Sequence, residues 1–267
     1  MKRKRIALLS VEVIILIVIA LLVFSHFKNR KHDLPQILES GRLYVLTDSS
    51  SLGFCKNGGK VGGFQYEIIK AFADTLGVEL VVTVENDLVK GVELLKSGDY
   101  NLIASMLPIT SERKTDVRFS MPLQWSSLVL VQIIMPDSGT VTHTNVLDLA
   151  GDTLAVSVHS PHQLRIAHLS DEIAQPIHIK EYKSKSEEQL VEQVSLHKIK
   201  MTVCDENSAK AYKRKYPNID VSLPLGFSQP MGWAAHSSSQ QLMDELNDFL
   251  DEFVGSSAYW EIYRRYY

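Results

Sequence analysis

Cysteine is scarce in this sequence, which has only Cys55 and Cys204 among 267 residues. Two cysteines are too few for a disulfide framework, and whether they pair cannot be read from the sequence. Cys204 lies within an apolar run, which favours a buried free thiol. The sequence also lacks a P-loop, a Gly-x-Ser-x-Gly motif and a zinc-binding motif. We therefore expect no enzymatic nucleophile, no cofactor and no metal site.

Isolated titratable residues do not change this expectation. His159, His162 and His168 have no acidic residues at metal-ligand spacing, and we interpret them as solvated or capping residues. Glu187 and Glu188, which have Lys183 and Lys185 nearby, are interpreted as a pair on a helix surface rather than a catalytic dyad.

The sequence has no basic surface of the kind that nucleic-acid binding requires. Its net charge is −3, and residues 1–32 hold seven basic residues against one acidic residue. The remainder therefore carries 21 basic and 30 acidic residues and is clearly acidic. We expect no nucleic-acid partner.

Long apolar runs are also few, and the main one is at residues 6–24, after the basic start Met1–Arg5. Its length is close to that of a helix crossing about 30 Å of hydrocarbon. No small-x-small cleavage site stands out, so we predict a retained membrane anchor with an exported globular part. A cleaved signal sequence is the alternative.

From residue 34 onward, the pattern is that of an α/β protein. Apolar residues recur at helical spacing from Ile68 to Leu76, and Gly77 ends that helix. The alternation of strands and helices predicts parallel strands with right-handed crossovers.

A polar connection near residues 136–140 separates two such α/β series. We predict that residues 1–33 are the anchor and linker, and that residues 34–267 form one bilobal domain. Lobe 1 would comprise about 34–131 and 228–267, and lobe 2 about 138–222. Two connections between lobes make a hinge, and a small ligand would bind in the cleft.

The segment from Ser105 to Pro122 is the main candidate for a binding motif. Thr110 is expected to cap a short helical turn, so that Arg113 projects from a loop at the carboxyl end of a strand. A guanidinium matches a carboxylate with two parallel hydrogen bonds. On spacing alone, a solvated arginine beside Glu112 and Asp116 is the alternative interpretation.

Three segments resemble the family 3 periplasmic solute-binding proteins. Residues 108–122 contain Pro-Ile-Thr-Ser-Glu-Arg and then Arg-Phe-Ser-Met-Pro, similar to the family's Thr-x-x-Arg and Phe-Ser-x-Pro elements. Residues 63–77 resemble its Gly-apolar-Asp signature and following helix, with Gln65 where an acid is usual. Residues 202–206, Thr-Val-Cys-Asp-Glu, resemble its strand-end aspartate.

The resemblance implies a type II periplasmic-binding-protein fold and assigns roles to individual residues. Arg113 would hold a ligand carboxylate, and Asp205 would hold an ammonium group from the opposite lobe. Ser160 and nearby backbone donors would hold the other carboxylate oxygen, although His159 stands where the family has glycine.

Three further residues are candidates for the same cleft. They are Thr110, the aromatic Phe54 and the aromatic Trp125, and a core or rim position is as plausible for each aromatic. Met106 and Pro108 replace polar contacts of amino-acid binders, so the ligand could differ from a simple amino acid.

A closer resemblance, in segments such as residues 34–41, 63–77, 94–98 and 259–266, is to the non-catalytic domain of membrane-bound lytic murein transglycosylase F. No catalytic Glu-Ser segment follows, so we expect no transglycosylase activity.

Two functions follow. One is binding of a carboxylate-bearing solute (an amino acid, peptide or muropeptide) at the periplasmic face of the inner membrane, for an ABC transporter permease or for sensing. The other is non-catalytic regulation of cell-wall metabolism through a partner enzyme. A dehydratase on this fold is a third possibility that no residue singles out.

Overall fold

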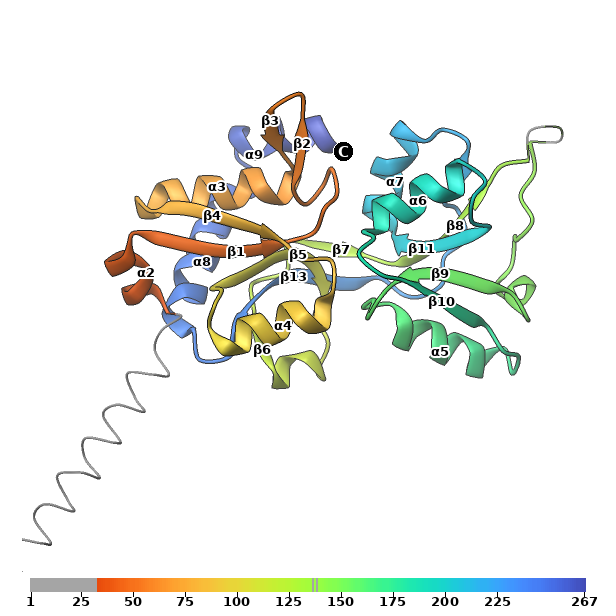
Figure 1. Ribbon diagram of the computed structural model, residues 1–267, viewed down its shortest axis with the longest axis horizontal. Coiled ribbons are helices and arrows are strands. Elements are labelled where there is room, and N and C mark those ends of the chain that lie inside the picture. Colours follow the sequence, from red (N-terminus) through yellow and green to blue (C-terminus); the bar gives the residue numbers. More distant parts are fainter. Residues whose placement is uncertain (1–32, 136, 138) are drawn as a thin grey trace, which may run out of the picture.

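The computed structural model describes residues 33–135, 137 and 139–267, which form two α/β lobes side by side (Figure 1). Each lobe is built on its own β-sheet, as the sequence predicts. Both sheets are mixed rather than wholly parallel, because the strands next to the two crossings run antiparallel to their neighbours. The predicted anchor, residues 6–24, lies outside the described residues. Within the described part of the chain, no helix is both long and apolar enough to cross a bilayer.

Lobe 1 contains a six-stranded sheet in the order β4-β1-β5-β13-β6, with β7 also paired to β13. The β4-β1-β5 part is parallel, and β13 runs antiparallel to its neighbours. The elements of this lobe are α2 (Leu34–Ser40), β1 (Arg42–Thr47), β2 (Cys55–Asn57), β3 (Lys60–Gly62), α3 (Phe64–Leu76), β4 (Glu79–Val84), α4 (Leu88–Ser97), β5 (Leu102–Pro108), the 3-10 turn η1 (Arg113–Thr115), β6 (Val117–Phe119), β7 (Gln124–Ser126), β13 (Gln229–His236), α8 (Gln240–Phe253) and α9 (Ser257–Tyr266).

Lobe 2 contains a five-stranded sheet in the order β10-β9-β11-β8-β12. Its β10-β9-β11 part is parallel, and β8 pairs antiparallel with both β11 and β12. The elements are β8 (Leu128–Ile133), the 3-10 turn η2 (Val146–Leu149), β9 (Thr153–Ser157), α5 (Gln163–Glu172), β10 (His178–Tyr182), α6 (Glu187–Ser195), β11 (Met201–Asp205), α7 (Glu206–Lys215) and β12 (Ile219–Asp220).

The chain crosses between the two sheets twice. The first crossing is at Ser127, because β7 pairs within the sheet of lobe 1 and β8 within that of lobe 2. This position precedes residue 131, where the sequence placed the end of lobe 1, because a single apolar run hides the change of sheet. The second crossing lies between an isolated bridge at Pro224 and the start of β13. These two segments run between the lobes in Figure 1.

The segment between β1 and α3 contains the two-stranded hairpin β2–β3. Its base is closed by a tight contact of two glycines. Gly63 has φ +138°, and a Cβ atom placed there would be 2.0 Å from the carbonyl oxygen of Gly53. Only glycine tolerates both the backbone conformation and this approach.

The aromatic residues near the C-terminus pack on lobe 1. Phe64, at the start of α3, makes edge-to-face contacts with Tyr259, Tyr263, Tyr266 and Tyr267. Such ring pairs are worth about 0.5–1.5 kcal/mol beyond the area they bury. They fix α9 against α3.

We predict that Gly63→Ala lowers the free energy of unfolding by at least about 1–3 kcal/mol, the usual cost of a backbone held in a glycine-only region. The clash with Gly53 would add to this. Gly91→Ala is the matched control, because Gly91 lies in α4 with its nearest neighbour 3.7 Å from the added methyl group. Alanine there should stabilise the helix by about 0.5–1 kcal/mol. Chemical denaturation measures the free energy of unfolding of both variants. Equal changes in the two variants would contradict a special requirement for glycine at position 63.

Candidate ligand-binding site between the lobes

A cavity of about 110 Å³ lies between the two lobes. Lobe 1 lines it with residues at the ends of β1 and β5 and at the start of α4, and lobe 2 with residues at the end of β9 and the first turns of α6 and α7. The carboxyl ends of parallel strands therefore meet here from both sheets, as is usual for ligand sites in open α/β sheets.

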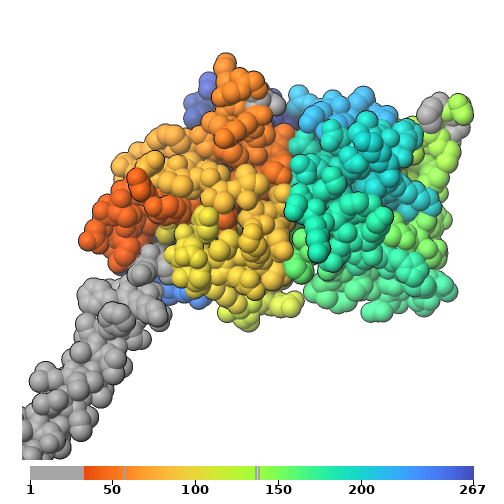
Figure 2. Space-filling view, viewed as in Figure 1, coloured from red at the N-terminus to blue at the C-terminus, as the bar shows by residue number. Residues whose placement is uncertain are grey.

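Direct hydrogen bonds hold the lobes together around the cavity. Ser186 Oγ donates to Ser49 O at 3.0 Å, and the Ser51 backbone N–H donates to a Glu188 carboxylate oxygen. His159 Nδ1 lies 2.9 Å from Asp87 Oδ1 across the same boundary. The space-filling view shows the lobes in contact along a continuous seam (Figure 2). The structure is therefore the closed arrangement of the two lobes.

Asp205 ends β11, caps α7 and lines the cavity. Its Oδ1 accepts hydrogen bonds from Ser126 Oγ at 2.9 Å and from the Ser208 backbone N–H at 3.1 Å. The side chain is buried, and no described basic residue forms an ion pair with it. Burial, together with the nearby charge of Glu187, raises the pKa of Asp205.

Asp48 directly follows β1 and faces the cavity from lobe 1. Ser105 Oγ donates to its Oδ2 at 3.2 Å. Burial raises the pKa of Asp48 more than any other cause, and the charge of Glu187 raises it further. Asp48 is not among the site residues predicted from the sequence. It follows a strand of lobe 1 directly, much as Asp205, which the family resemblance identified, ends a strand of lobe 2.

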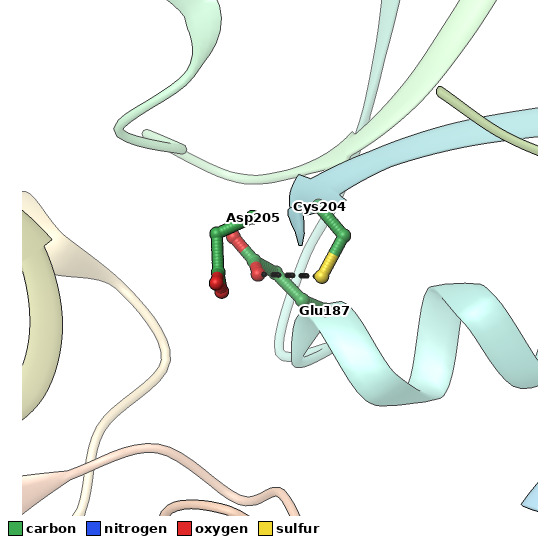
Figure 3. Close-up of side chains that lie close together, drawn as sticks. All are labelled: Glu187, Cys204 and Asp205. Atoms are coloured by element: carbon green, nitrogen blue, oxygen red, sulfur yellow. Dashed lines mark hydrogen bonds between the residues drawn. The ribbon is translucent and has the colours of Figure 1, made fainter. Parts of the chain in front are cut away.

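Glu187 lies at the first position of α6 and points toward Cys204 and Asp205 (Figure 3). Burial by itself would raise its pKa, but His162, whose Nε2 lies 2.6 Å from Glu187 Oε1, holds the pKa of Glu187 below its usual value. The Cys204 thiol donates to Glu187 Oε2 at 3.4 Å. Burial raises the pKa of that thiol well above its usual range.

These positions correct two interpretations made from the sequence. Glu187 and Glu188 are not a surface pair, because Glu187 lines the cavity and Glu188 is only 6% exposed. His162 is buried and bonded to Glu187 rather than solvated or capping. Cys55 and Cys204 are both free thiols in the structure.

Glu187, Cys204 and Asp205 are also the described residues whose arrangement could hold a metal ion. One ligand atom from each lies within 4.8 Å of the other two. Carboxylate, thiolate and imidazole are suitable ligands for zinc. Cys204, however, does not line the cavity, and its thiol proton is engaged with Glu187.

Arg113 reaches from the start of η1 in lobe 1 to lobe 2. Its Nη1 donates to Pro108 O at 3.1 Å, and its Nη2 donates to Pro161 O, across the boundary, at 3.2 Å. Burial lowers the pKa of Arg113, partly offset by Glu112. Asp116, the other acid suggested as its surface partner, pairs with Lys96 instead. Arg113 adjoins the cavity through Pro161, which lines it.

Ser160 is buried beside Pro161, but its hydroxyl oxygen accepts the His162 backbone N–H at 3.3 Å. The preceding residue, His159, has φ +51°. His159 therefore adopts a left-handed backbone conformation, which glycine adopts without strain. The substitution of histidine for the family's glycine thus leaves this backbone conformation possible. The His159 side chain adds the contact with Asp87 across the lobes.

The remaining predicted site residues lie away from the cavity lining. Thr110 Oγ1 accepts the Arg113 backbone N–H at 3.3 Å and so caps the turn, as predicted. Phe54 packs edge-to-face on Tyr66 in lobe 1. Trp125, on β7 beside the hinge, is 61% exposed. Of the six predicted residues, only Asp205 lines the cavity directly.

Comparison with protein families gives a match over residues 42–267 to the bacterial extracellular solute-binding proteins, family 3. The chain belongs to this family. The match begins at the first strand and includes both lobes, so the interlobe cavity lies wholly within it.

Curated relatives include proteins named membrane-bound lytic murein transglycosylase F. One from Desulfosudis oleivorans is 30% identical over 246 residues, covering 91% of this chain and 52% of the relative. Another, from Pseudomonas fluorescens strain Pf0-1, is 30% identical over 250 residues, covering 92% and 50%. The chain therefore spans about half the length of the curated relatives it matches.

Solved structures show the same two-lobed fold. An ancestral arginine-binding protein bound to arginine matches with a TM-score of 0.72 and 23% identity, covering 85% of this chain and 98% of that one. A solute receptor for L-cysteine from Neisseria gonorrhoeae matches with a TM-score of 0.73 and 18% identity, covering 86% and 91%. At these identities the likeness establishes the type II periplasmic-binding-protein fold.

We predict that Asp205→Asn stabilises the unliganded protein at neutral pH. Asparagine can still accept the Ser208 N–H as a helix cap, and it removes a buried charge beside Glu187. Because the folded-state pKa of Asp205 is raised, the wild-type penalty is present at high pH and disappears as the pH falls through that pKa. The stability difference between variant and wild type should therefore shrink on acidification.

Glu206→Gln is the matched control, since Glu206 follows Asp205 and bonds Lys210 and Ser127. Those bonds lower the pKa of Glu206. The control should therefore destabilise the protein at neutral pH and lose its effect as the pH falls through the lowered pKa. Thermal unfolding between neutral and acidic pH measures both variants. A destabilised Asp205→Asn protein at neutral pH would refute the electrostatic account.

Proposed function

We propose that this chain binds a small amino-acid-like solute in the interlobe cavity, outside the cytoplasm, for transport or sensing. The supporting observation is that the two lobes close on a cavity with Asp205 in its wall and Arg113 at its edge. Arg113 comes from lobe 1 and Asp205 from lobe 2. A ligand with both a carboxylate and an ammonium group would connect them.

Arg113 has further N–H groups that could donate hydrogen bonds to a ligand carboxylate. A guanidinium carries five N–H donors, and two of them reach carbonyl oxygens of the described chain. The carbonyls of Pro108 and Pro161 orient the guanidinium, and its burial excludes the water that would weaken an ion pair. Asp205 matches an ammonium group in the same way, since it is buried and no basic residue in the described part of the chain pairs with it.

The size of the cavity favours one amino acid. The cavity of about 110 Å³ has room for several water-sized groups, since one such group needs about 10–15 Å³. The proposed location is the periplasmic face of the inner membrane, with residues 6–24 as the anchor and a transporter permease as one possible partner.

A second candidate function is non-catalytic regulation of cell-wall metabolism. It is supported by the similarity to proteins named lytic murein transglycosylase F over nearly the whole of this chain. Under this proposal the closed cavity would report an amino acid or a short peptide from the cell wall to a partner enzyme.

The first experiment is a thermal-shift screen of free amino acids, short peptides and muropeptides. Ligand at a concentration 100 times its Kd stabilises a protein by about 2.7 kcal/mol, which raises the unfolding temperature measurably. Stabilisation by at least one free amino acid supports the proposal. Stabilisation by muropeptides alone would favour the second candidate.

We predict that Arg113→Ala weakens binding of the best amino acid by about 2–5 kcal/mol, because one partner of a buried charge pair is lost. That corresponds to roughly a 30-fold to several-thousand-fold rise in Kd. Arg42→Ala is the control, because Arg42 is an exposed partner of Glu79 at the start of β1. Calorimetric titration compares the three proteins. Equal affinities for wild type and Arg113→Ala would exclude a carboxylate clamp at Arg113.

A further inference from the structure

A second hollow lies on lobe 1 and is separate from the interlobe cavity. It is a groove of about 430 Å³, and no residue lines both the groove and the cavity. Its lining includes the whole of β6 together with Lys114, Pro122 and Pro230. We call this hollow the β6 groove.

The strand β6 forms an open edge of the sheet, because β13 is the one strand in the described part of the chain that pairs with it. The Ser120 backbone N–H donates to Trp233 O on β13 at 2.9 Å, so the backbone groups of Ser120 face that neighbour. Backbone groups of alternate residues in an antiparallel strand point in opposite directions. Those of Val117 and Phe119 therefore point away from β13, and an extended chain laid along this edge could exchange hydrogen bonds with both residues.

An exposed tryptophan continues the apolar surface of the β6 groove. Trp125 lies directly opposite Pro230 in the pairing of β7 with β13, and it is 61% exposed. Directly opposite residues on antiparallel strands have neighbouring side chains on the same face. Trp125 therefore adjoins the groove through Pro230. Because aromatic residues are enriched where proteins bind each other, this surface suits a protein segment.

Both charged residues that line the β6 groove are basic. Neither Lys114 nor Arg118 forms an ion pair with a described carboxylate. Asp116, which lies between them in the sequence, pairs with Lys96. Arg118 Nε donates to Ser237 O at 3.2 Å, which leaves the two Nη groups for another acceptor. The groove is thus a basic feature on a chain that is acidic from residue 33 onward, and its charge complements an acidic partner.

We propose that the β6 groove binds an extended, acidic segment of a partner protein, which adds a strand to the sheet of lobe 1. A residue of the added strand directly opposite Arg118 would lie on the same face as Arg118, so a carboxylate there would pair with the guanidinium. Short edge strands with charged residues also protect proteins against unwanted pairing. Protection alone accounts for neither the groove beside β6 nor the exposed Trp125. The proposal is independent of which ligand occupies the interlobe cavity.

The test uses a fluorescently labelled hexapeptide that alternates valine with glutamate, so that its carboxylates share one face of an extended strand. The matched control peptide has glutamine in place of glutamate. In fluorescence-anisotropy titrations of the full chain, we expect the glutamate peptide to bind at least about 5-fold more tightly, the ratio that corresponds to roughly 1 kcal/mol of charge pairing. Higher ionic strength should reduce this preference, because salt screens exposed charges.

Charge-reversal variants locate the bound peptide. Arg118→Glu and Lys114→Glu should each reduce the preference for glutamate. The double variant should instead favour a peptide with lysine in place of glutamate, and a loss of folding cannot produce such a reversal. Lys60→Glu is the matched control, because Lys60 is exposed on β3, at the opposite edge of lobe 1 from β6 (Figure 1). This control should leave the preference unchanged.

Two N-methylated forms of the glutamate peptide test the addition of a strand. Methylation of alternate residues removes the N–H donors along one edge of an extended peptide and leaves those of the other edge in place. The form that is methylated on the edge facing β6 should bind about 10-fold more weakly than the other form, because its hydrogen bonds to β6 are lost.

Equal binding of the glutamate and glutamine peptides, or no binding of either, would overturn the proposal. Equal binding of the two methylated forms would exclude the addition of a strand and would overturn it as well. Binding that the double variant leaves unchanged would place the peptide elsewhere. Self-association of the chain that the double variant abolishes, without a preference for the glutamate peptide, would assign the groove to a second copy and contradict the acidic partner.

Discussion

Closure of the lobes places the Asp48 carboxylate within electrostatic reach of Glu187, which itself lies beside Asp205. Three carboxylates then line one cavity, and their mutual repulsion opposes the closed arrangement. The cross-lobe hydrogen bonds of Ser186, Ser51 and His159 favour it. An ammonium group of the proposed ligand would offset part of this repulsion, so the balance between open and closed forms depends on what occupies the cavity.

The same constraint explains why residues away from the ligand matter. His162 and Cys204 do not form the proposed ligand contacts, but both bond to Glu187 and fix its position. Arg113 bonds carbonyl groups in both lobes, so its guanidinium is oriented only when the lobes have closed. The site is therefore assembled by closure, and a ligand that completes its charge balance also stabilises that geometry.

Much of this arrangement could be predicted from the sequence. The periodicity of α3, its terminating Gly77 and the strand-helix alternation gave the two-lobe fold, because local patterns determine these elements. Asp205 was found through its resemblance to the strand-end aspartate of the family. Asp48 also stands at the carboxyl end of a strand, but no motif singled it out in the glycine- and serine-rich segment that it begins.

The spacing of Glu187 along α6 indicates its true position. It precedes Leu190 by three residues and Val191 by four, so the half-buried Glu187 lies on the same side of α6 as these two buried residues. Position on the helix, rather than charge, determines whether such a residue is on the surface. Other features depend on tertiary contacts that no local pattern encodes, including the left-handed conformation of His159 and the exposed position of Trp125.

A crystal structure of the chain with the amino acid that binds it most tightly tests the central claim most directly. The account predicts the ligand within the interlobe cavity, with its carboxylate on Arg113 and its α-ammonium on Asp205. A ligand bound elsewhere, or one whose carboxylate and ammonium groups contact neither residue, would contradict it.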